Sequence, residues 1–316
     1  MTHSYRILIT GGAGSLGTNL VEHLLPRGHQ ILVLDNFVTG KRGVLPKLDG
    51  LTSVEGSVTD ESLLETLLTE FSPEILIHSA ASYKDPNDWL TDIDTNIRGA
   101  AIVSRAAERH SVKRLINFQT ALCYGMPEVV PIPVDHACRP FTSYGISKTA
   151  GEQFILSSKV PSVSIRLANV TAPRLAIGPI PTFYQRLSTG KSCFCSDTVR
   201  DFLDIDDFLA FVDLALDPSG PSGVFNLSTG IGHSIKEIFD HALRHLGLPP
   251  TTEVPILPAQ PDDVPCVILD PSETTKAFGW AARVSFDTML SKMFTWYDEH
   301  GVTDLYSHLS SPSTPR

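Results

Sequence analysis

The sequence TGGAGSLG at residues 10–17 carries glycines at GxxGxxG spacing, namely Gly11, Gly14 and Gly17. It follows the β-branched run RILIT (6–10) and leads into the amphipathic stretch GTNLVEHLLPRG (17–28), so it lies where a strand turns into a helix. Glycines at such a turn let the backbone bend tightly and let a pyrophosphate approach the N–H groups of the helix N-terminus. On this pattern alone, a purely structural glycine turn is the alternative.

The next strand-like run, QILVLD (30–35), ends in Asp35. A carboxylate roughly 20 residues after the glycine turn accepts the hydroxyls of an adenosine ribose and repels a 2′-phosphate. We therefore expect a dinucleotide site that prefers NAD, formed by Gly11, Gly14, Ser15, Leu16, Gly17, Asp35 and Asn36. Lys41 and Arg42 follow closely, so NADP is the alternative cofactor.

Short apolar runs and amphipathic stretches alternate along the first half of the chain. The strand-like runs TSVEG, EILIHSAA, RLINFQT and VSIRLANV are separated by helical patterns such as ESLLETLLTEF and NIRGAAIVSRAAERH. This alternation predicts an α/β fold with a parallel sheet covered on both faces. GSVTD (56–60) and HSAAS (78–82) end two of the strands, so we expect them to border the cofactor.

After Asn169 the pattern loosens into proline-rich connections and predicts a smaller, mixed α/β lobe. We expect a dinucleotide-binding domain over 1–165 that also carries the catalytic residues. The segment 166–303 is then mainly a substrate lobe, with parts that return to the sheet. Residues 304–316 form a short polar tail.

Charge and cysteine content exclude several classes of protein. A net charge of −10 argues against nucleic-acid binding, which depends on clustered Lys and Arg. The five cysteines form no CxxC pair, so neither a disulfide framework nor a metal site is expected. No export signal and no long apolar run is present, so we expect a cytoplasmic protein without a membrane span.

The stretch TSYGISKTAGE (142–152) places Tyr144 one helical turn before Lys148. If the segment is helical, both side chains lie on the same face. A tyrosine with a pKa near 10 is a poor base at neutral pH, and an adjacent ammonium favours its phenolate. The pair therefore indicates acid–base catalysis, with an ordinary surface pair as the alternative.

Together these motifs resemble the extended short-chain dehydrogenase/reductase family. Within it they resemble the bacterial NAD-dependent nucleotide-sugar epimerase/dehydratases of O-antigen, lipopolysaccharide and related glycan pathways. The matching segments are GGAGSLG, Asp35-Asn36, HSAA, Asn96-Ile97-Arg98-Gly99, Thr120 with Tyr144 and Lys148, RLANVTAPR and VRDFLDIDD. The resemblance implies a Rossmann-type doubly wound sheet, bound NAD, a UDP-sugar substrate and a homodimer formed by helices around 92–110 and 143–158.

The resemblance also implies roles for individual residues. Tyr144, Lys148 and Thr120 are the expected catalytic set, in which Lys148 also binds the nicotinamide ribose. Further cofactor contacts are expected from Ser57, Val58, Ala80, Ala81 and Asn96. Substrate contacts are expected from Tyr83, Lys84, Thr120, Asn169, Phe194 and Arg200. The alternatives are a solvated loop for Tyr83 and Lys84, a core position for Phe194, and a surface ion pair with Asp201 or Asp204 for Arg200.

Three departures from the family pattern bear on the reaction. Ala121 and Leu122 follow Thr120 where the 4,6-dehydratases carry Asp-Glu, which disfavours dehydration. Gln119 stands where a serine is common, and AQPDDV (259–264) replaces a segment that often supplies a second phosphate-binding arginine. We therefore expect a UDP-sugar epimerase. A dehydratase or net oxidoreductase, and a non-catalytic nucleotide sensor, are the alternatives.

Overall fold

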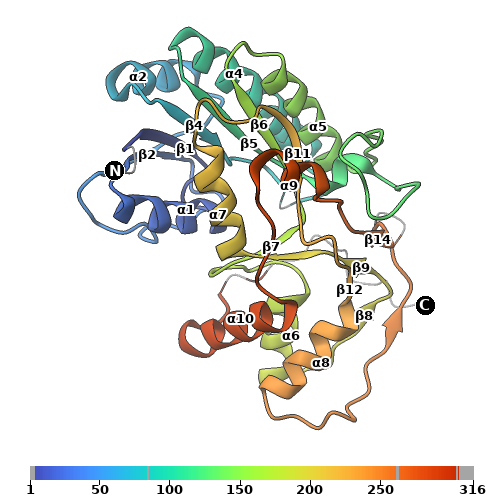
Figure 1. Ribbon diagram of the computed structural model, residues 1–316. Coiled ribbons are helices and arrows are strands. Elements are labelled where there is room, and N and C mark those ends of the chain that lie inside the picture. Colours follow the sequence, from blue (N-terminus) through green and yellow to red (C-terminus); the bar gives the residue numbers. More distant parts are fainter. Residues whose placement is uncertain (1–3, 84, 261–262, 304, 306–316) are drawn as a thin grey trace.

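A seven-stranded parallel sheet forms the centre of the larger lobe (Figure 1). The structure is a computed structural model that describes residues 4–83, 85–260, 263–303 and 305. The strand order is β11-β6-β5-β4-β1-β2-β3. Strands β2 and β3 follow β1 on one side and β4, β5 and β6 follow it on the other, so the order of the strands reverses between β1 and β4. The strands are β1 (Arg6–Thr10), β2 (Gln30–Asp35), β3 (Leu51–Glu55), β4 (Ile75–His78), β5 (Arg114–Thr120), β6 (Ser162–Leu167) and β11 (Gly223–Leu227). Ligands bind such sheets at the carboxyl ends of the strands, beside the point of reversal.

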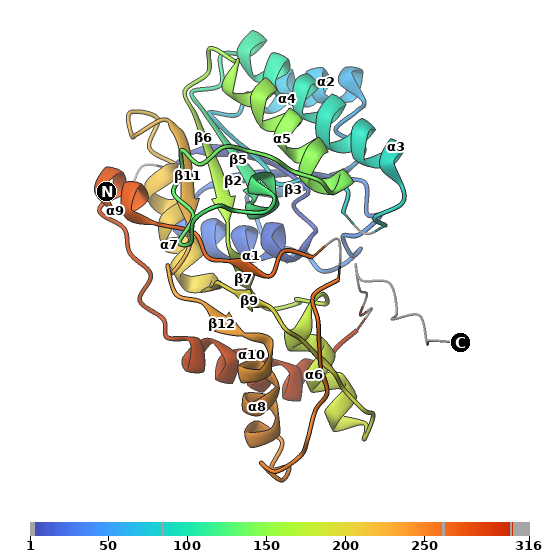
Figure 2. The same ribbon diagram turned by 90° about the vertical axis from the view of Figure 1, so that its right-hand side faces the viewer.

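Helices cover both faces of this sheet, as Figures 1 and 2 show. On one face lie α1 (Ser15–Leu24), α7 (Ile205–Ala215) and α9 (Ser272–Phe278); on the other lie α2 (Glu61–Phe71), α4 (Gly99–Arg109) and α5 (Ser143–Leu156). Along β1, Ile7 and Ile9 join the core on the first face and Leu8 joins the core on the second. Because both faces are buried, the strands are almost continuously apolar. The predicted α/β fold with a doubly wound parallel sheet is confirmed.

The smaller lobe packs three helices around an aromatic core. These helices are α6 (Pro179–Ser188), α8 (Ile235–His245) and α10 (Phe286–His300), and their buried side chains include Phe183, Phe239 and Phe294. Short strand pairs connect this lobe to the sheet: β7 (Asn169–Thr171) with β10 (Phe202–Asp204), β8 (Cys195–Ser196) with β13 (Ile256–Leu257), and β9 (Val199–Arg200) with β12 (His233–Ser234) and β14 (Cys266–Val267).

The chain crosses between the lobes more than once. Strand β11 pairs with β6, and α7 and α9 pack against the sheet although they follow residue 165. The remaining short helices are η1 (Leu25–Arg27), α3 (Trp89–Asp92), η2 (Ile93–Arg98) and η3 (Ala121–Tyr124). The last three lie at or near the active site described below.

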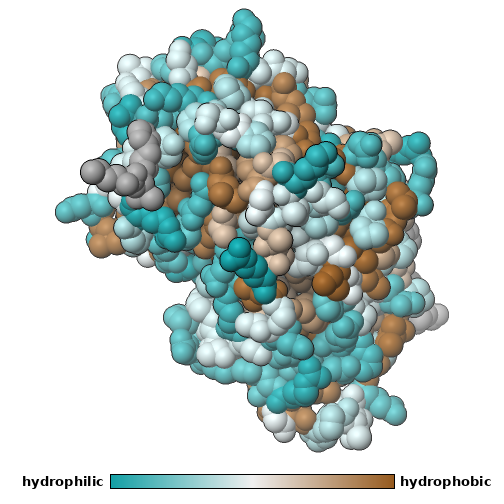
Figure 3. All heavy atoms as spheres, in the orientation of Figure 1, coloured by the Kyte–Doolittle hydropathy of each residue, from teal (hydrophilic) through white to brown (hydrophobic). Residues whose placement is uncertain are grey.

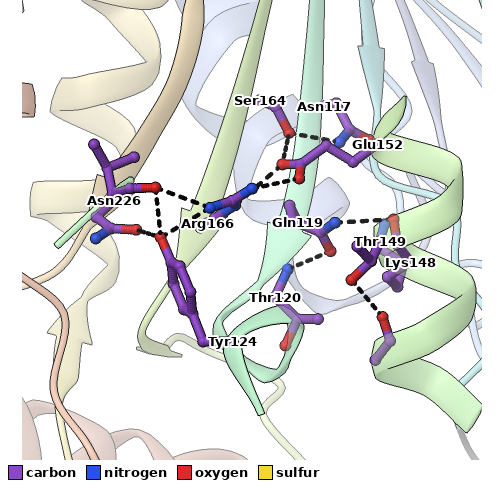
Figure 4. A network of polar contacts seen from close by, with 12 residues as sticks. Asn117, Gln119, Thr120, Tyr124, Lys148, Thr149, Glu152, Ser164, Arg166 and Asn226 are labelled. Carbon is purple, nitrogen blue, oxygen red and sulfur yellow. Dashed lines mark hydrogen bonds and ion pairs between the residues drawn. The ribbon is translucent and has the colours of Figure 1, made fainter. Parts of the chain in front are cut away.

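A buried polar network fixes helix α5 to the sheet (Figure 4). The Arg166 guanidinium on β6 donates to the Glu152 carboxylate on α5 at 2.8 Å and to the Tyr124 hydroxyl at 3.0 Å. The Tyr124 hydroxyl in turn donates to Asn226 Oδ1 on β11 at 2.7 Å, and Ser164 donates to Glu152 at 2.7 Å. A buried ion pair is tolerated when further hydrogen bonds satisfy both partners, and this network supplies them.

Hydrophilic side chains cover much of the face shown in Figure 3, and apolar residues there form scattered areas rather than one continuous patch. Among the described residues, no helix combines the length and apolar character that crossing a bilayer requires.

Candidate active site

The glycine turn after β1 has no room for side chains where it touches the neighbouring strand end. Gly11 has a φ of +70°, and a Cβ built on it would lie 2.6 Å from the backbone nitrogen of Ala80. A Cβ on Gly17 would lie 2.4 Å from the Gly11 carbonyl oxygen. A Cβ on Gly14 would meet only the Gly11 oxygen at 3.4 Å, so the turn is open on that side. This cradle, at the N-terminus of α1, fits the pyrophosphate of a dinucleotide.

The neighbouring side chains hold this turn in place. The Ser15 hydroxyl donates to the Pro173 carbonyl at 3.1 Å and so joins the start of α1 to the loop after β7. Leu16 packs against the core on the same face. Asn36 Oδ1 accepts from the backbone of Val38 at 3.1 Å and shapes the loop after β2.

Asp35 lies at the end of β2 beside the glycine turn. Its carboxylate accepts the backbone N–H groups of Ala13 and Phe37, each at 2.8 Å, and the residue is 6% exposed. Arg42 forms an ion pair with Glu55 and lies over the Phe37 ring at 4.8 Å. This exposed ion pair is weak, and it is the buried Asp35 carboxylate, which would repel a 2′-phosphate, that favours NAD over NADP.

Several predicted cofactor contacts border the same edge. Val58 is buried against Gly99, and the Ser57 hydroxyl bonds that of Thr59 at 2.8 Å. Ala80 follows β4 against Gly11, with Ala81 next to it.

Asn96 has a different environment from the one expected. Its amide exchanges two hydrogen bonds with the Ser82 backbone, both at 2.9 Å, and donates to the Ser147 hydroxyl at 3.0 Å. The residue is 2% exposed, so its amide is committed to the protein. The structure thus shows Asn96 joining the loop after β4 to helix α5, and a direct cofactor contact stays a prediction.

The three expected catalytic residues belong to strand β5 and to the helix packed against it, α5. Thr120 ends this strand, and its hydroxyl accepts the N–H of Leu122 at 3.2 Å. Tyr144 and Lys148 lie in α5, whose first turn is capped by Thr142. The Lys148 ammonium donates to the Phe118 carbonyl on β5 at 2.6 Å. Strand β5 and helix α5 therefore carry the set on two packed elements, joined at the Lys148 ammonium.

Burial controls the proton affinities at this site. Desolvation lowers the pKa of the Lys148 ammonium to about 8, and the Glu152 carboxylate opposes that fall. Burial also raises the pKa of the Tyr144 phenol, and Tyr83 and Asp92 add to the rise. A phenol in this environment stays protonated at neutral pH unless further positive charge is brought close to it.

His78 is held as a neutral, structural residue. Burial and the nearby Lys148 charge lower its pKa to about 3, and its Nδ1 pairs with the Thr10 hydroxyl at 2.8 Å. It is 1% exposed at the end of β4, so it does not compete as the catalytic base.

Tyr83 lies next to the catalytic tyrosine. Its ring centroid is 6.1 Å from that of Tyr144, and the two rings are tilted by 56°. The Tyr83 ring therefore lies beside the Tyr144 ring, and its contact with a substrate stays a prediction. Lys84 lies outside the described residues.

The predicted nucleotide contacts belong to the strands of the smaller lobe. Asn169 on β7 is exposed, and its amide donates to the Asp201 carbonyl at 3.0 Å, next to Arg200 in the chain. Phe194 precedes β8 and is 42% exposed. The alternative interpretation of Phe194 as a core residue is therefore wrong.

Arg200 has a different acidic partner from the two that the sequence suggested. It pairs with Asp263 and donates to the Val199 carbonyl at 2.8 Å. Asp201 instead accepts the Thr229 hydroxyl at 2.6 Å, and Asp204 pairs with Lys292 at 2.7 Å. The alternative of an ion pair with Asp201 or Asp204 is therefore wrong, and the expected phosphate contact of Arg200 stays a prediction.

Two acidic residues at this site were not singled out from the sequence. Asp92 is 1% exposed, and its Oδ2 accepts the Ser143 hydroxyl at 2.7 Å beside Tyr144. Nothing in the DIDT run distinguishes it from Asp94, which forms an exposed ion pair with Arg98. Asp263 lies in AQPDDV, the segment in which the family pattern predicts an arginine and this sequence has none.

We predict that Lys148→Met abolishes turnover but stabilises the NAD-free protein at pH 7. The lowered pKa of Lys148 means that the unfolded chain binds the proton more tightly, so wild-type stability rises between pH 8 and the unfolded pKa. Removing the buried ammonium gains about 3 kcal/mol, and losing its hydrogen bond costs about 1 kcal/mol. Urea unfolding at pH 7 should show a net gain of about 2 kcal/mol that shrinks toward pH 10. A variant less stable than wild type at pH 7 would contradict this electrostatic account.

Comparison with known proteins places the chain in a family. The model of the NAD dependent epimerase/dehydratase family matches residues 7–228. The UDP-glucose 4-epimerase of Halalkalibacterium halodurans is 30% identical, over 93% of this chain and 96% of the relative. The crystal structure of the Bordetella bronchiseptica enzyme WbmG in complex with NAD and UDP is 61% identical, covers 98% of both chains and has a TM-score of 0.92. The Bordetella bronchiseptica enzyme WbmH in complex with NAD+ is 39% identical, with 94% and 100% coverage and a TM-score of 0.89. This chain belongs to the NAD-dependent epimerase/dehydratase family.

Proposed function

We propose that this protein epimerises a UDP-sugar at C4 through a transient 4-keto sugar and has no net redox change. The observation that carries the proposal is that Thr120 ends β5 and that the helix carrying Tyr144 and Lys148 packs against this strand, beside a cradle for a dinucleotide. The UDP-glucose 4-epimerase relative and the complex of WbmG with NAD and UDP support the substrate class.

The glycine turn and Asp35 would hold NAD, which accepts a hydride from the sugar C4 and later returns it. The backbone N–H groups at the start of α1 would bind the pyrophosphate, and the Asp35 carboxylate would accept the hydroxyls of the adenosine ribose. Lys148 would bind the nicotinamide ribose. Ser57, Val58, Ala80 and Ala81 would line the same site.

Tyr144 would take the proton of the sugar 4-hydroxyl. Burial raises the pKa of the Tyr144 phenol, so the Lys148 ammonium, which donates to the Phe118 carbonyl, would have to move toward this phenol to favour its phenolate. Thr120 can donate a hydrogen bond to the sugar oxygen and orient it toward Tyr144. The same groups return the proton once the hydride has been restored to the opposite face of the sugar.

Inversion requires the sugar to turn while the nucleotide stays bound. Asn169, Arg200 and Phe194 belong to the smaller lobe, whereas the catalytic residues belong to the larger lobe. A guanidinium suits a diphosphate because it offers two parallel donors. Asp263 competes for the same guanidinium, so nucleotide binding would require this ion pair to loosen.

The residues after Thr120 favour epimerisation over dehydration. Ala121 and Leu122 provide no carboxyl group, and Cys123 is fully buried with a thiol whose pKa burial raises. Removal of water needs an acid and a base at the sugar carbons, and this turn supplies neither. Biosynthesis of O-antigen or a related glycan, in the cytoplasm, stays a prediction from the family resemblance.

The substrate is identified by incubation in D2O with a panel of UDP-hexoses, UDP-N-acetylhexosamines and UDP-uronic acids, followed by NMR and mass spectrometry. The proposal predicts an isomer of unchanged mass that is inverted at C4 and carries no deuterium there. Tyr144→Phe should retain NAD and lose turnover. Loss of water with deuterium incorporation would make the protein a dehydratase.

We also propose that the protein is a homodimer joined through α4 and α5. Figure 2 shows these helices side by side, with α3 next to them. Ile146 and Phe154 on α5 are 49% and 47% exposed, and Trp89 at the start of α3 is 64% exposed. A cluster of large exposed apolar side chains on adjacent helices is typical of an interface.

We predict that the double variant Ile146→Glu with Phe154→Glu is monomeric, because buried unpaired carboxylates oppose association. Light scattering should show half the wild-type mass. The matched control is Leu214→Glu, which replaces a side chain that is 43% exposed on α7, and it should stay dimeric. A monomeric wild type, or a double variant that stays dimeric, would exclude this interface.

A further inference from the structure

Gln119 bridges the strand and the helix that carry the catalytic residues (Figure 4). Its Nε2 donates to the Lys148 backbone carbonyl at 2.9 Å, and its Oε1 accepts the Thr120 N–H at 2.7 Å. We infer that Gln119 is a positioning residue, which fixes the separation between Thr120 on β5 and the Tyr144–Lys148 turn of α5. This inference rests on the proposed function, because it concerns the spacing of the groups proposed to move the proton.

The orientation of the Gln119 amide follows from its neighbours. A backbone N–H can only donate and a backbone carbonyl can only accept, so the oxygen must face Thr120 and the nitrogen must face Lys148. Gln119 is 2% exposed, and water therefore cannot easily replace either partner. The Gln119 side chain is long enough to reach from strand β5 to the backbone of α5, so this one residue makes both contacts.

Lys148 is consequently held at two points by consecutive residues of β5. Its ammonium donates to the Phe118 carbonyl at 2.6 Å, and its own carbonyl accepts from Gln119. Successive side chains of a strand point to opposite faces. Phe118 packs against Phe208 of α7 on one face, while Gln119 reaches α5 on the other.

The close backbone contacts of α5 are made with other elements than β5. A Cβ on Gly145 would lie 2.9 Å from the Leu122 carbonyl oxygen of η3, and one on Gly151 would lie 2.3 Å from the Asn96 carbonyl oxygen of η2, whereas Gln119 and Lys148 supply hydrogen bonds between α5 and β5 itself. Proton transfer is sensitive to small displacements, since a shift of about 1 Å can cost about 100-fold in rate. A hydrogen bond at the residue that carries the catalytic ammonium is therefore well placed to set the reacting geometry.

The test compares two variants of Gln119 with a matched control on the same strand. Gln119→Met keeps a similar length and loses both hydrogen bonds. Gln119→Glu, when ionised, keeps an acceptor for the Thr120 N–H and loses the donor to Lys148. The control is Asn117→Leu: Asn117 is also 2% exposed, and its amide contacts Ser164 at 2.9 Å rather than the Lys148 backbone.

For the active UDP-sugar, we expect Gln119→Met to lower kcat about 10- to 100-fold with little change in KM or in NAD affinity. A substrate deuterated at C4 should show a larger isotope effect on kcat, because the chemical step becomes slower. Gln119→Glu should show the same kcat-selective loss at a pH where its carboxyl is ionised and a smaller loss where it is protonated, because a protonated carboxyl still donates to the Lys148 carbonyl. Asn117→Leu should keep the wild-type kcat even if its Tm falls as far.

Equal losses of kcat in the Asn117 and Gln119 variants would reduce Gln119 to a structural residue and overturn the inference. So would a Gln119 defect confined to KM or to Tm. If Gln119→Met does not fold, Gln119→Glu decides the question, because it preserves the shape of the side chain. Failure of the proposed function is recognised separately, as wild-type protein that yields no C4 isomer from any UDP-sugar.

Discussion

The buried Lys148 ammonium is the interaction on which the architecture of this site depends. Its donation to the Phe118 carbonyl places a positive charge between strand β5 and helix α5, away from solvent. The fall in its pKa to about 8 corresponds to a cost of about 3 kcal/mol, which the rest of the fold must offset. The Lys148 charge helps to lower the pKa of His78, which stays neutral. The Glu152 carboxylate, one turn further along the helix, partly offsets the fall in the pKa of Lys148.

The position of α5 determines whether this charge is useful. The side of α5 that carries Glu152 is joined to β6 and β11 through Arg166 and the Tyr124 hydroxyl. The side of α5 that carries Ser147 and Gly151 is joined to η2. The Asn96 amide donates to the Ser147 hydroxyl, and a Cβ on Gly151 would lie 2.3 Å from the Asn96 carbonyl oxygen. Polar contacts of defined direction and close backbone packing together leave one arrangement of the helix. The Glu152 side of α5 is thus held by the buried network, and the turn that carries Lys148 is held by its own hydrogen bonds to β5.

The doubly wound sheet and the glycine cradle beside Asp35 could be predicted from local sequence. Alternating apolar runs, the glycine spacing and Asp35 act through neighbours that are close in the chain, and the structure places Asp35 within hydrogen-bond distance of Ala13 and Phe37. The Tyr144–Lys148 pair was equally readable, because helical periodicity puts both residues on one face.

Contacts between distant segments could not be predicted in this way. Arg200 and Asp263 are 63 residues apart and meet only because β14 pairs with β9. Asn96 fits a cofactor contact by motif, and only the tertiary structure shows its amide committed to Ser82 and Ser147. Gln119 departs from the family pattern in sequence, but its partner on α5 depends on how the helix sits against the sheet.

The central claim is that the hydride removed from a sugar returns to the same sugar. This is tested directly with a mixture of two substrates: 12C UDP-sugar deuterated at C4, and UDP-sugar that carries 13C throughout its hexose and no deuterium. The products are then analysed by mass spectrometry. The account predicts that deuterium stays at C4 of the 12C isomer and that the 13C isomer gains none. Deuterium in the 13C product, or its loss to solvent, would contradict internal return and with it the role assigned to Tyr144 and Lys148.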